Sequence, residues 1–393
     1  MPAVQVVHPS GYAAERAYVA RVLLGEYLGL DVEVGEAPVQ AWEVRCGEGS
    51  FTIPDVLFQT PERTWLTHAS LPGDGDLYGE DVFGSAFFLL TRYEEAVRDE
   101  RDEHGRFPAE ASILVREEVI ERPLVNEYGE ALWRQLLELA PRLERRQRTF
   151  RVVPSHDVDY PYSTLRQRVS AIRQGQLRAA LPRDPFDSFD LLMDESERRG
   201  LRAAFYFIPD DAPYSLDEPR IRELLRRIHL RGHEIGYHAS YHAFQDAERT
   251  QREFERLLAV CRAEGIKQDH WGGRHHFLRW EPATWAAWEE AGLAYDSTVG
   301  FTNRPGFRAG ACFEYPVFDL HARRELRLHE RPLVLMDTPT LDRQELPDEE
   351  LVHLIDRLRD QCRRYRGDFT VLWHNNWLVT ERQRRLLRAA LER

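Results

Sequence analysis

The chain has few cysteines, almost no lysine and no long apolar run, and these shortages limit the classes of protein to which it can belong. Its four cysteines are far apart and show no Cys-x-x-Cys spacing, so we expect reduced thiols in a cytosolic protein. Lys267 is the only lysine, and arginine carries the rest of the positive charge. The net charge of −13, without a basic patch interleaved with aromatic side chains, argues against a dedicated nucleic-acid binder.

The sequence also lacks the signals of export and membrane insertion. No stretch reaches the length of a membrane span, and the amino terminus has neither the charged region nor the long apolar region of a secretory signal. We therefore expect a cytoplasmic protein with no integral membrane segment. Apolar material is ample, since 42% of the 393 residues are hydrophobic and 11% are aromatic, which suffices for packed cores in two domains.

A charged run at 144–148 separates two patterns along the chain. Before it, segments of helical period alternate with short strand-like pieces, which predicts a smaller α/β domain over residues 1–148 with a turn-rich loop at Leu71–Asp81. From Arg151 onward, strands and helices alternate regularly. That alternation predicts parallel strands with helices outside them over residues 149–393, arranged either as a barrel or as an open sheet.

Side chains that can do chemistry recur at the carboxyl ends of the expected strands. In a barrel those ends form the catalytic face, so this placement favours a barrel over an open sheet. The segment Gly272-Gly273-Arg274 is expected as a turn after a short strand at Gln268–Trp271. The candidate residues are Asp157, Asp159, His238, Arg274, Asp296 and His374.

Two histidines, His238 and His242, stand four residues apart after an apolar strand-like run. On a helical turn this spacing brings both imidazoles to one face, where they can grip one cation. Two histidines, a carboxylate and an open position for water make a catalytic zinc site, and Asp157 and Asp159 are available as carboxylates. A pair of surface histidines on a polar turn is the alternative.

Five short motifs follow one another along the chain: Ser155-His156-Asp157-Val158-Asp159, His238-Ala239-Ser240-Tyr241-His242, Gly272-Gly273-Arg274, Tyr295-Asp296-Ser297-Thr298 and Leu372-Trp373-His374. In order and rough spacing, they resemble those of NodB-type polysaccharide deacetylases, a carbohydrate esterase family. The resemblance covers about 150–393, and it implies a distorted (β/α)7-type barrel, the NodB homology domain. It also implies a divalent metal, usually zinc, and the hydrolysis of an acetyl group from a sugar. Within residues 1–148, the stretches Phe83-Gly84-Ser85-Ala86-Phe87-Phe88 and Tyr93-Glu94-Glu95 resemble the domain that precedes a bacterial subgroup of these enzymes.

The resemblance implies a metal site and a base. Asp159, His238 and His242 match the metal ligands, Asp157 matches the catalytic base, and Arg274 matches the arginine that holds the base ionised. The commoner first motif of the family has two adjacent aspartates, whereas Val158 separates them here. Which aspartate is base and which is ligand is therefore left open.

The resemblance also implies an acid and its support. His374 matches the general acid, and Asp296 lies near the acidic residue that supports it. The third motif departs from the common form, with His275 and His276 where aromatic and proline residues are usual. Physically, an imidazole with an unperturbed pKa near neutrality can protonate a departing amine or alcohol.

The sequence thus predicts a metal-dependent hydrolase that removes acetyl groups from an acetylated sugar of a glycan or glycan precursor. The same barrel could instead serve a metal amidohydrolase of a small nitrogen compound, or a catalytically silent glycan-binding protein. The presence of every candidate ligand, base and acid argues against a catalytically silent protein. An open groove lined by aromatic side chains would favour a sugar chain, and a closed pocket would favour a metabolite.

Overall fold

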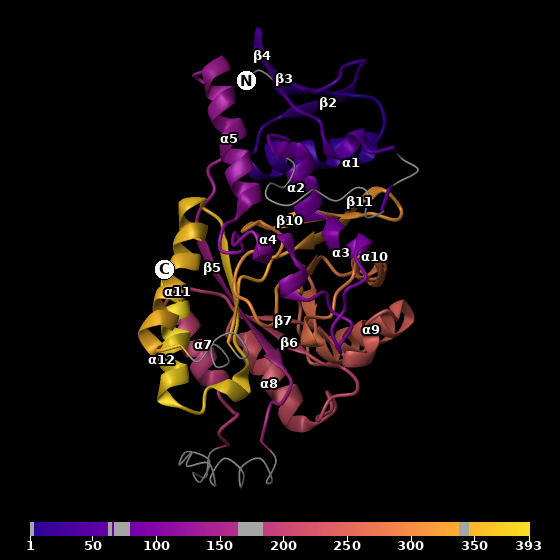
Figure 1. Ribbon diagram of the computed structural model, residues 1–393. Coiled ribbons are helices and arrows are strands. Elements are labelled where there is room, and N and C mark those ends of the chain that lie inside the picture. Colours follow the sequence, from indigo (N-terminus) through magenta and orange to yellow (C-terminus); the bar gives the residue numbers. More distant parts are fainter. Residues whose placement is uncertain (1–3, 62–64, 67–78, 164–183, 338–345) are drawn as a thin grey trace.

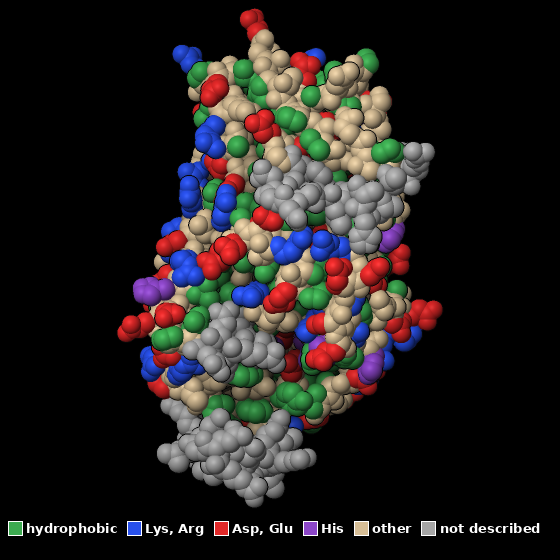
Figure 2. Space-filling model, in the orientation of Figure 1, with side chains coloured by type: hydrophobic (Ala, Val, Ile, Leu, Met, Phe, Trp, Pro, Cys, Tyr) green, Lys and Arg blue, Asp and Glu red, His purple; other side chains and the backbone are tan. Residues whose placement is uncertain are grey.

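The computed structural model describes residues 4–61, 65–66, 79–163, 184–337 and 346–393. These residues form a mixed α/β structure with two sheets (Figure 1). Most of the loop predicted at Leu71–Asp81 lies outside the described part of the chain. None of the described helices is long and apolar enough to cross a membrane. Positive and negative side chains are interspersed over the face shown in Figure 2.

The smaller sheet has four strands in the order β2-β1-β3-β4. Its first two strands are parallel, and β3 is antiparallel to both β1 and β4. Between β1 and β2, helix α1 (Ala13–Ala20) continues as a π-helical segment, η1 (Arg21–Tyr27). The strands are β1 (Val4–His8), β2 (Val32–Glu36), β3 (Trp42–Cys46) and β4 (Gly49–Ile53).

Helices α1 and α2 lie between the smaller sheet and two strands of the larger one, β10 (Tyr315–Asp319) and β11 (Arg324–Glu330) (Figure 1). Helix α2 is apolar on all sides, and every residue from Phe83 to Leu90 is buried, as expected for a helix with no solvent-facing side. Asp81 caps it by accepting a hydrogen bond from the Gly84 backbone N–H, with 2.8 Å between N and Oδ1. The helices of this region are α2 (Val82–Leu90), α3 (Tyr93–Val97), α4 (Ile113–Arg116) and α5 (Leu124–Leu139).

The larger sheet has nine strands in the order β10-β11-β9-β8-β7-β6-β5-β13-β12. All neighbours are parallel except β10 and β11, which form an antiparallel pair. The strands are β5 (Arg151–Val158), β6 (Ala204–Phe207), β7 (Glu234–Ala239), β8 (Gly272–His275), β9 (Tyr295–Asp296), β10 (Tyr315–Asp319), β11 (Arg324–Glu330), β12 (Leu335–Met336) and β13 (Asp368–Leu372).

The connecting helices surround this sheet (Figure 1), which confirms the expectation of parallel strands with helices outside them. The sheet curls as a barrel does but keeps two edges, β10 and β12, among the described residues. The structure is therefore barrel-like, and its described residues form nine strands where a seven-stranded type was expected. The helices are α7 (Phe189–Glu197), α8 (Pro219–Leu230), α9 (Ala247–Ala263), α10 (Pro282–Ala291), α11 (Asp348–Arg364) and α12 (Glu381–Ala390).

Strand β5 continues through Pro154 to Val158. Asp157 therefore lies within the strand, opposite Tyr206 of β6, and Asp159 follows directly after its end. Side chains two residues apart in an extended chain point to the same face. This period places both aspartates on one side of the sheet.

The segment predicted as a turn, Gly272-Gly273-Arg274, is strand β8. Its glycines are needed because neighbouring strands approach too closely for a side chain. A Cβ at Gly273 would lie 1.8 Å from the backbone oxygen of Tyr237, and one at Gly272 would lie 2.2 Å from the ring of Tyr295. Glycine here therefore reflects packing within a sheet, not a reversal of the chain.

The N-terminal region, residues 4–148, shares its hydrophobic core with the larger sheet, since one cluster of buried residues extends from Val4 to Leu391. A buried ion pair also joins the two parts. Arg308 donates to Glu95 with 2.9 Å between Nε and Oε1 and 2.5 Å between Nη2 and Oε2, and both side chains are at most 2% exposed. Arg92 donates to the same carboxylate.

Glu95→Gln would leave Arg92 and Arg308 buried without the carboxylate between them. We expect the free energy of unfolding to fall by about 3–5 kcal/mol, because an uncompensated buried charge is costly, as measured by chemical denaturation. The matched control is Glu325→Gln, which breaks the exposed pair of Glu325 with Arg21 and is expected to cost less than about 1 kcal/mol. Equal losses in the two variants would contradict this account.

Candidate active site

The carboxyl ends of β5, β7 and β8 bring together one carboxylate and two imidazoles. Asp159, His238 and His276 form a group that could hold a metal ion, with ligand atoms all within 4.8 Å of one another. Asp159 Oδ1 lies 3.2 Å from His238 Nε2 and 3.4 Å from His276 Nδ1. The two imidazole nitrogens are themselves 3.2 Å apart. One carboxylate oxygen and two imidazole nitrogens are thus close enough to bind a single metal ion.

His238 is held by its other ring nitrogen. Its Nδ1 lies 2.8 Å from the backbone oxygen of Arg274, on the neighbouring strand β8. This geometry fits an Nδ1–H that donates to the carbonyl and leaves Nε2 with a free lone pair toward Asp159. Metal-binding histidines are commonly oriented in this way.

The surroundings of Asp159 fit a cation. Its Oδ1 is buried and accepts no hydrogen bond of good geometry from the described residues, although two imidazole nitrogens are close. Burial alone would raise the pKa of this carboxyl, but the adjacent His238 and His276 outweigh it and hold the pKa well below its usual range. An ionised oxygen and two nitrogens form the donor set that zinc takes in catalytic sites, with one position left for water or substrate.

Asp157 lies beside this group and is paired with Arg274. The distance from Arg274 Nη1 to Asp157 Oδ1 is 2.8 Å, and both side chains are buried. The second oxygen, Oδ2, is 3.7 Å from His238 Nε2. The guanidinium is fixed by further hydrogen bonds, from Nη2 to Ser155 Oγ at 3.0 Å and from Nε to the backbone oxygen of Ser297 at 2.7 Å. The buried carboxylate thus has a rigid compensating charge.

His374 follows β13 and is held by Asp337, which follows the adjacent strand β12. The Nδ1 atom is 2.8 Å from Asp337 Oδ1, and the backbone N–H of His374 donates to Oδ2 at 2.7 Å. Nε2 is 3.7 Å from Asp159 Oδ2. Burial would lower the pKa of the imidazole, but the charge and hydrogen bond of Asp337 outweigh it and raise the pKa to about 10.

Asp296 does not contact His374 through a hydrogen bond. It is buried on β9 and accepts hydrogen bonds from the backbone N–H and the hydroxyl of Thr298. Burial raises its pKa to about 7. The sequence assigned the support of His374 to Asp296, whereas the hydrogen bonds to His374 come from Asp337. Asp337 carries the same sequence signal as the other candidates, a carboxylate directly after an apolar strand.

His242 lies outside the donor group. Strand β7 remains extended through Ala239 and a 3-10 turn follows, so the helical spacing assumed for His238 and His242 does not apply. His242 is exposed and contacts the ring of Tyr241. The second imidazole of the donor group belongs instead to His276, which lies directly after β8.

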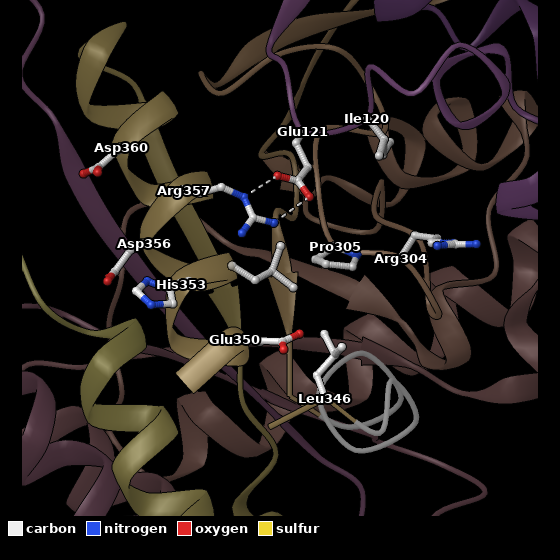
Figure 3. A pocket seen from close by; sticks show the side chains of 11 residues that line it. Ile120, Glu121, Arg304, Pro305, Leu346, Glu350, His353, Asp356, Arg357 and Asp360 are labelled. Atoms are coloured by element: carbon white, nitrogen blue, oxygen red, sulfur yellow. Dashed lines mark hydrogen bonds and ion pairs between the residues drawn. The ribbon is translucent and has the colours of Figure 1, made fainter. Parts of the chain in front are cut away.

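The donor group, Asp157 and His374 line a cavity of about 220 Å³, to which the N-terminal region also contributes residues. Among the lining residues are Glu103, His104 and Arg106, together with Phe277, whose side chain is exposed. A second cavity, with a larger volume of about 680 Å³, lies beside α11 (Figure 3). There Arg357 and Glu121 face each other as an ion pair, and none of the predicted site residues lines that cavity.

Known proteins resemble parts of the chain. Residues 4–141 match a family of unknown function (DUF7033), a match that ends before β5. No curated protein matches the chain. A similar solved structure is that of a candidate polysaccharide deacetylase from Mycobacterium smegmatis, with a TM-score of 0.43 and 19% identity, covering 62% of this chain and 82% of that one.

Two further solved structures show a comparable likeness. A probable polysaccharide deacetylase from Pseudomonas aeruginosa PAO1 has a TM-score of 0.41 and 15% identity, covering 62% of this chain and 83% of that one. Puue allantoinase has a TM-score of 0.40 and 11% identity, covering 62% of this chain and 82% of that one. Because the sequence identities and TM-scores are this low, the function of the chain has to be inferred from its own side chains.

Asp337→Asn would remove the negative charge that holds His374. We expect the pKa of His374 to fall by about one unit or more, since an adjacent opposite charge typically raises an imidazole pKa by that amount. Titration of the imidazole C–H resonances by NMR, in metal-free protein, measures it. Asp296→Asn is the control and should leave the titration of His374 unchanged; a larger effect from Asp296→Asn would show that the support has been assigned to the wrong carboxylate.

Proposed function

We propose that this protein is a metal-dependent deacetylase that removes an acetyl group from an acetylated sugar, in a glycan or a glycan precursor. The observation that carries the proposal is the convergence of three pieces at the ends of neighbouring parallel strands. They are the donor group of Asp159, His238 and His276, the Arg274–Asp157 pair, and the Asp337–His374 pair. Together they resemble the machinery of NodB-type polysaccharide deacetylases.

Hydrolysis of an amide or ester needs an activated water, a polarised carbonyl group and a proton for the leaving group. A zinc ion bound by Asp159, His238 and His276 would supply the first two, because zinc lowers the pKa of bound water to about 7 and polarises carbonyl oxygens. The remaining proton transfers fall to the other side chains of the site. Each is positioned by a partner that the structure defines.

Asp157 is the proposed base. Its Oδ1 is engaged by Arg274, whereas its Oδ2 faces the donor group at 3.7 Å from His238 Nε2. The free oxygen can therefore accept a proton from a water at that group. Asp159, which lies between the two imidazoles, is the proposed ligand. The contacts of each carboxylate thus support these roles for the two aspartates.

His374 is the proposed acid. Its Nδ1–H points to Asp337, so protonation places the second proton on Nε2, the nitrogen nearer to Asp159. The raised pKa keeps the imidazolium form populated at neutral pH. From Nε2 the proton can pass to the departing amine or alcohol of the substrate.

The second candidate function is hydrolysis of an amide in a small nitrogen compound. The small cavity favours it, since 220 Å³ is below the range of about 300–1,000 Å³ that is usual for ligand pockets. The exposed ring of Phe277 at the same cavity favours a sugar, whose apolar face can pack on it. Release of acetate from N- and O-acetylated sugars, beside ring opening of small cyclic amides followed by the gain of one water in the mass of the product, decides between the two.

Two matched variants separate the proposed roles of the aspartates. Asp159→Asn should lose the metal, because an amide is a poor substitute for the only anionic ligand. Asp157→Asn should keep the metal and lose about 10²–10⁴-fold in turnover, because an amide cannot accept the proton of water. Metal content per chain is measured beside acetate release. The reverse pattern would exchange the two roles, and full activity in both variants would reject the mechanism.

The third ligand can be tested with an equally close pair. His276→Ala should raise the metal dissociation constant by more than the ~10–100-fold typical of losing an outer partner of a ligand. His242→Ala should leave it unchanged, because that side chain is exposed and outside the donor group. Competition with a chromophoric chelator measures both constants. Loss of affinity in His242→Ala alone would restore the ligand set that the sequence indicates.

A further inference from the structure

A turn of the N-terminal region reaches the cavity that contains the proposed metal group. The turn, residues 102–106, contributes three side chains to the lining beside Asp157 and Asp159. Asp102 organises it by accepting hydrogen bonds from the backbone N–H groups of His104 and Arg106, both at 2.9 Å, and from Arg106 Nε at 2.8 Å. The turn is therefore rigid enough to position what it touches.

This turn clamps the chain that follows His276. Arg106 donates from Nη1 to the backbone oxygen of Phe277 at 2.9 Å, and Arg279 donates from Nε to the backbone oxygen of His104 at 2.7 Å. The imidazole of His104 packs on the ring of Phe277, with 4.7 Å between centroids. Two hydrogen bonds and a ring contact thus hold Phe277 and Arg279 against the N-terminal region.

The clamped segment is strained. Phe277 and Leu278 have φ values of 62° and 51°, in the left-handed region that residues with a Cβ adopt at a cost in free energy. Such conformations persist where surrounding contacts impose them, and they cluster at functional sites. The strained pair follows His276 directly, so relaxation of its backbone would displace the imidazole from Asp159 and His238.

We propose that the 102–106 turn positions His276 in the metal group, which makes the region that matches DUF7033 a working part of the active site. This inference rests on the proposed function. All three donors come from the larger sheet and its loops, while the N-terminal region fixes the geometry of one of them. The same contacts present Phe277 at the cavity, so the turn also shapes the wall that meets the substrate.

Arg106→Ala tests the proposal, because it removes the hydrogen bond to Phe277. We expect the dissociation constant for cobalt(II), measured by chelator competition, to rise about tenfold or more, within the range for losing an outer partner of a ligand. The visible absorption of the cobalt-loaded protein should also change, since it reports the coordination of the ion. His104→Ala, which removes the ring contact, is a second variant should Arg106→Ala fail to fold.

Arg21→Ala is the matched control. It removes another arginine of the N-terminal region that bonds to the larger sheet, from Nη2 to Glu325 Oε2 at 2.9 Å, but that does not line the cavity. Its cobalt affinity and spectrum should equal those of the unaltered protein. Folded Arg106→Ala and His104→Ala proteins with unaltered affinity and spectrum would overturn the inference alone. Absence of cobalt binding in the unaltered protein would overturn the proposed function as well.

Discussion

The buried ion pair between Arg274 and Asp157 is the interaction on which the arrangement of the site depends. All three guanidinium nitrogens of Arg274 donate, to Asp157 and Ser155 on β5 and to Ser297 just after β9. Its backbone oxygen meanwhile orients His238 on β7. A single residue on β8 therefore aligns the ends of strands on both of its sides. The glycines beside it allow the strands to come close enough for this.

The sequence predicted those features that depend on local pattern. Alternating strands and helices predicted the parallel sheet. Polar residues after apolar runs pointed to Asp157, Asp159, His238, Arg274, Asp296 and His374. The structure brings all of these together except Asp296. Local pattern suffices here because parallel strands end at one edge of a sheet, so a residue just after any strand is directed to a shared site.

Features that depend on backbone conformation or distant packing could not be predicted. The spacing of His238 and His242 suits one metal only on a helix, and the strand β7 excludes that geometry. Asp296 and Asp337 both follow or end an apolar strand, and the choice between them depends on β12 lying next to β13. The contribution of residues 102–106 depends on contacts across more than a hundred residues of chain, for which no short motif exists.

The strand order also determines when the site becomes complete as the chain is synthesised. The three proposed donors lie between residues 159 and 276, and β5 to β8 are consecutive neighbours in the sheet. Asp337 and His374 come later, and β13 must still pair with β5 from across more than two hundred residues. A nascent chain that has emerged from the ribosome as far as His276, the residue after β8, thus carries every proposed cation donor, but it gains its proposed proton donor only after β13 has been made.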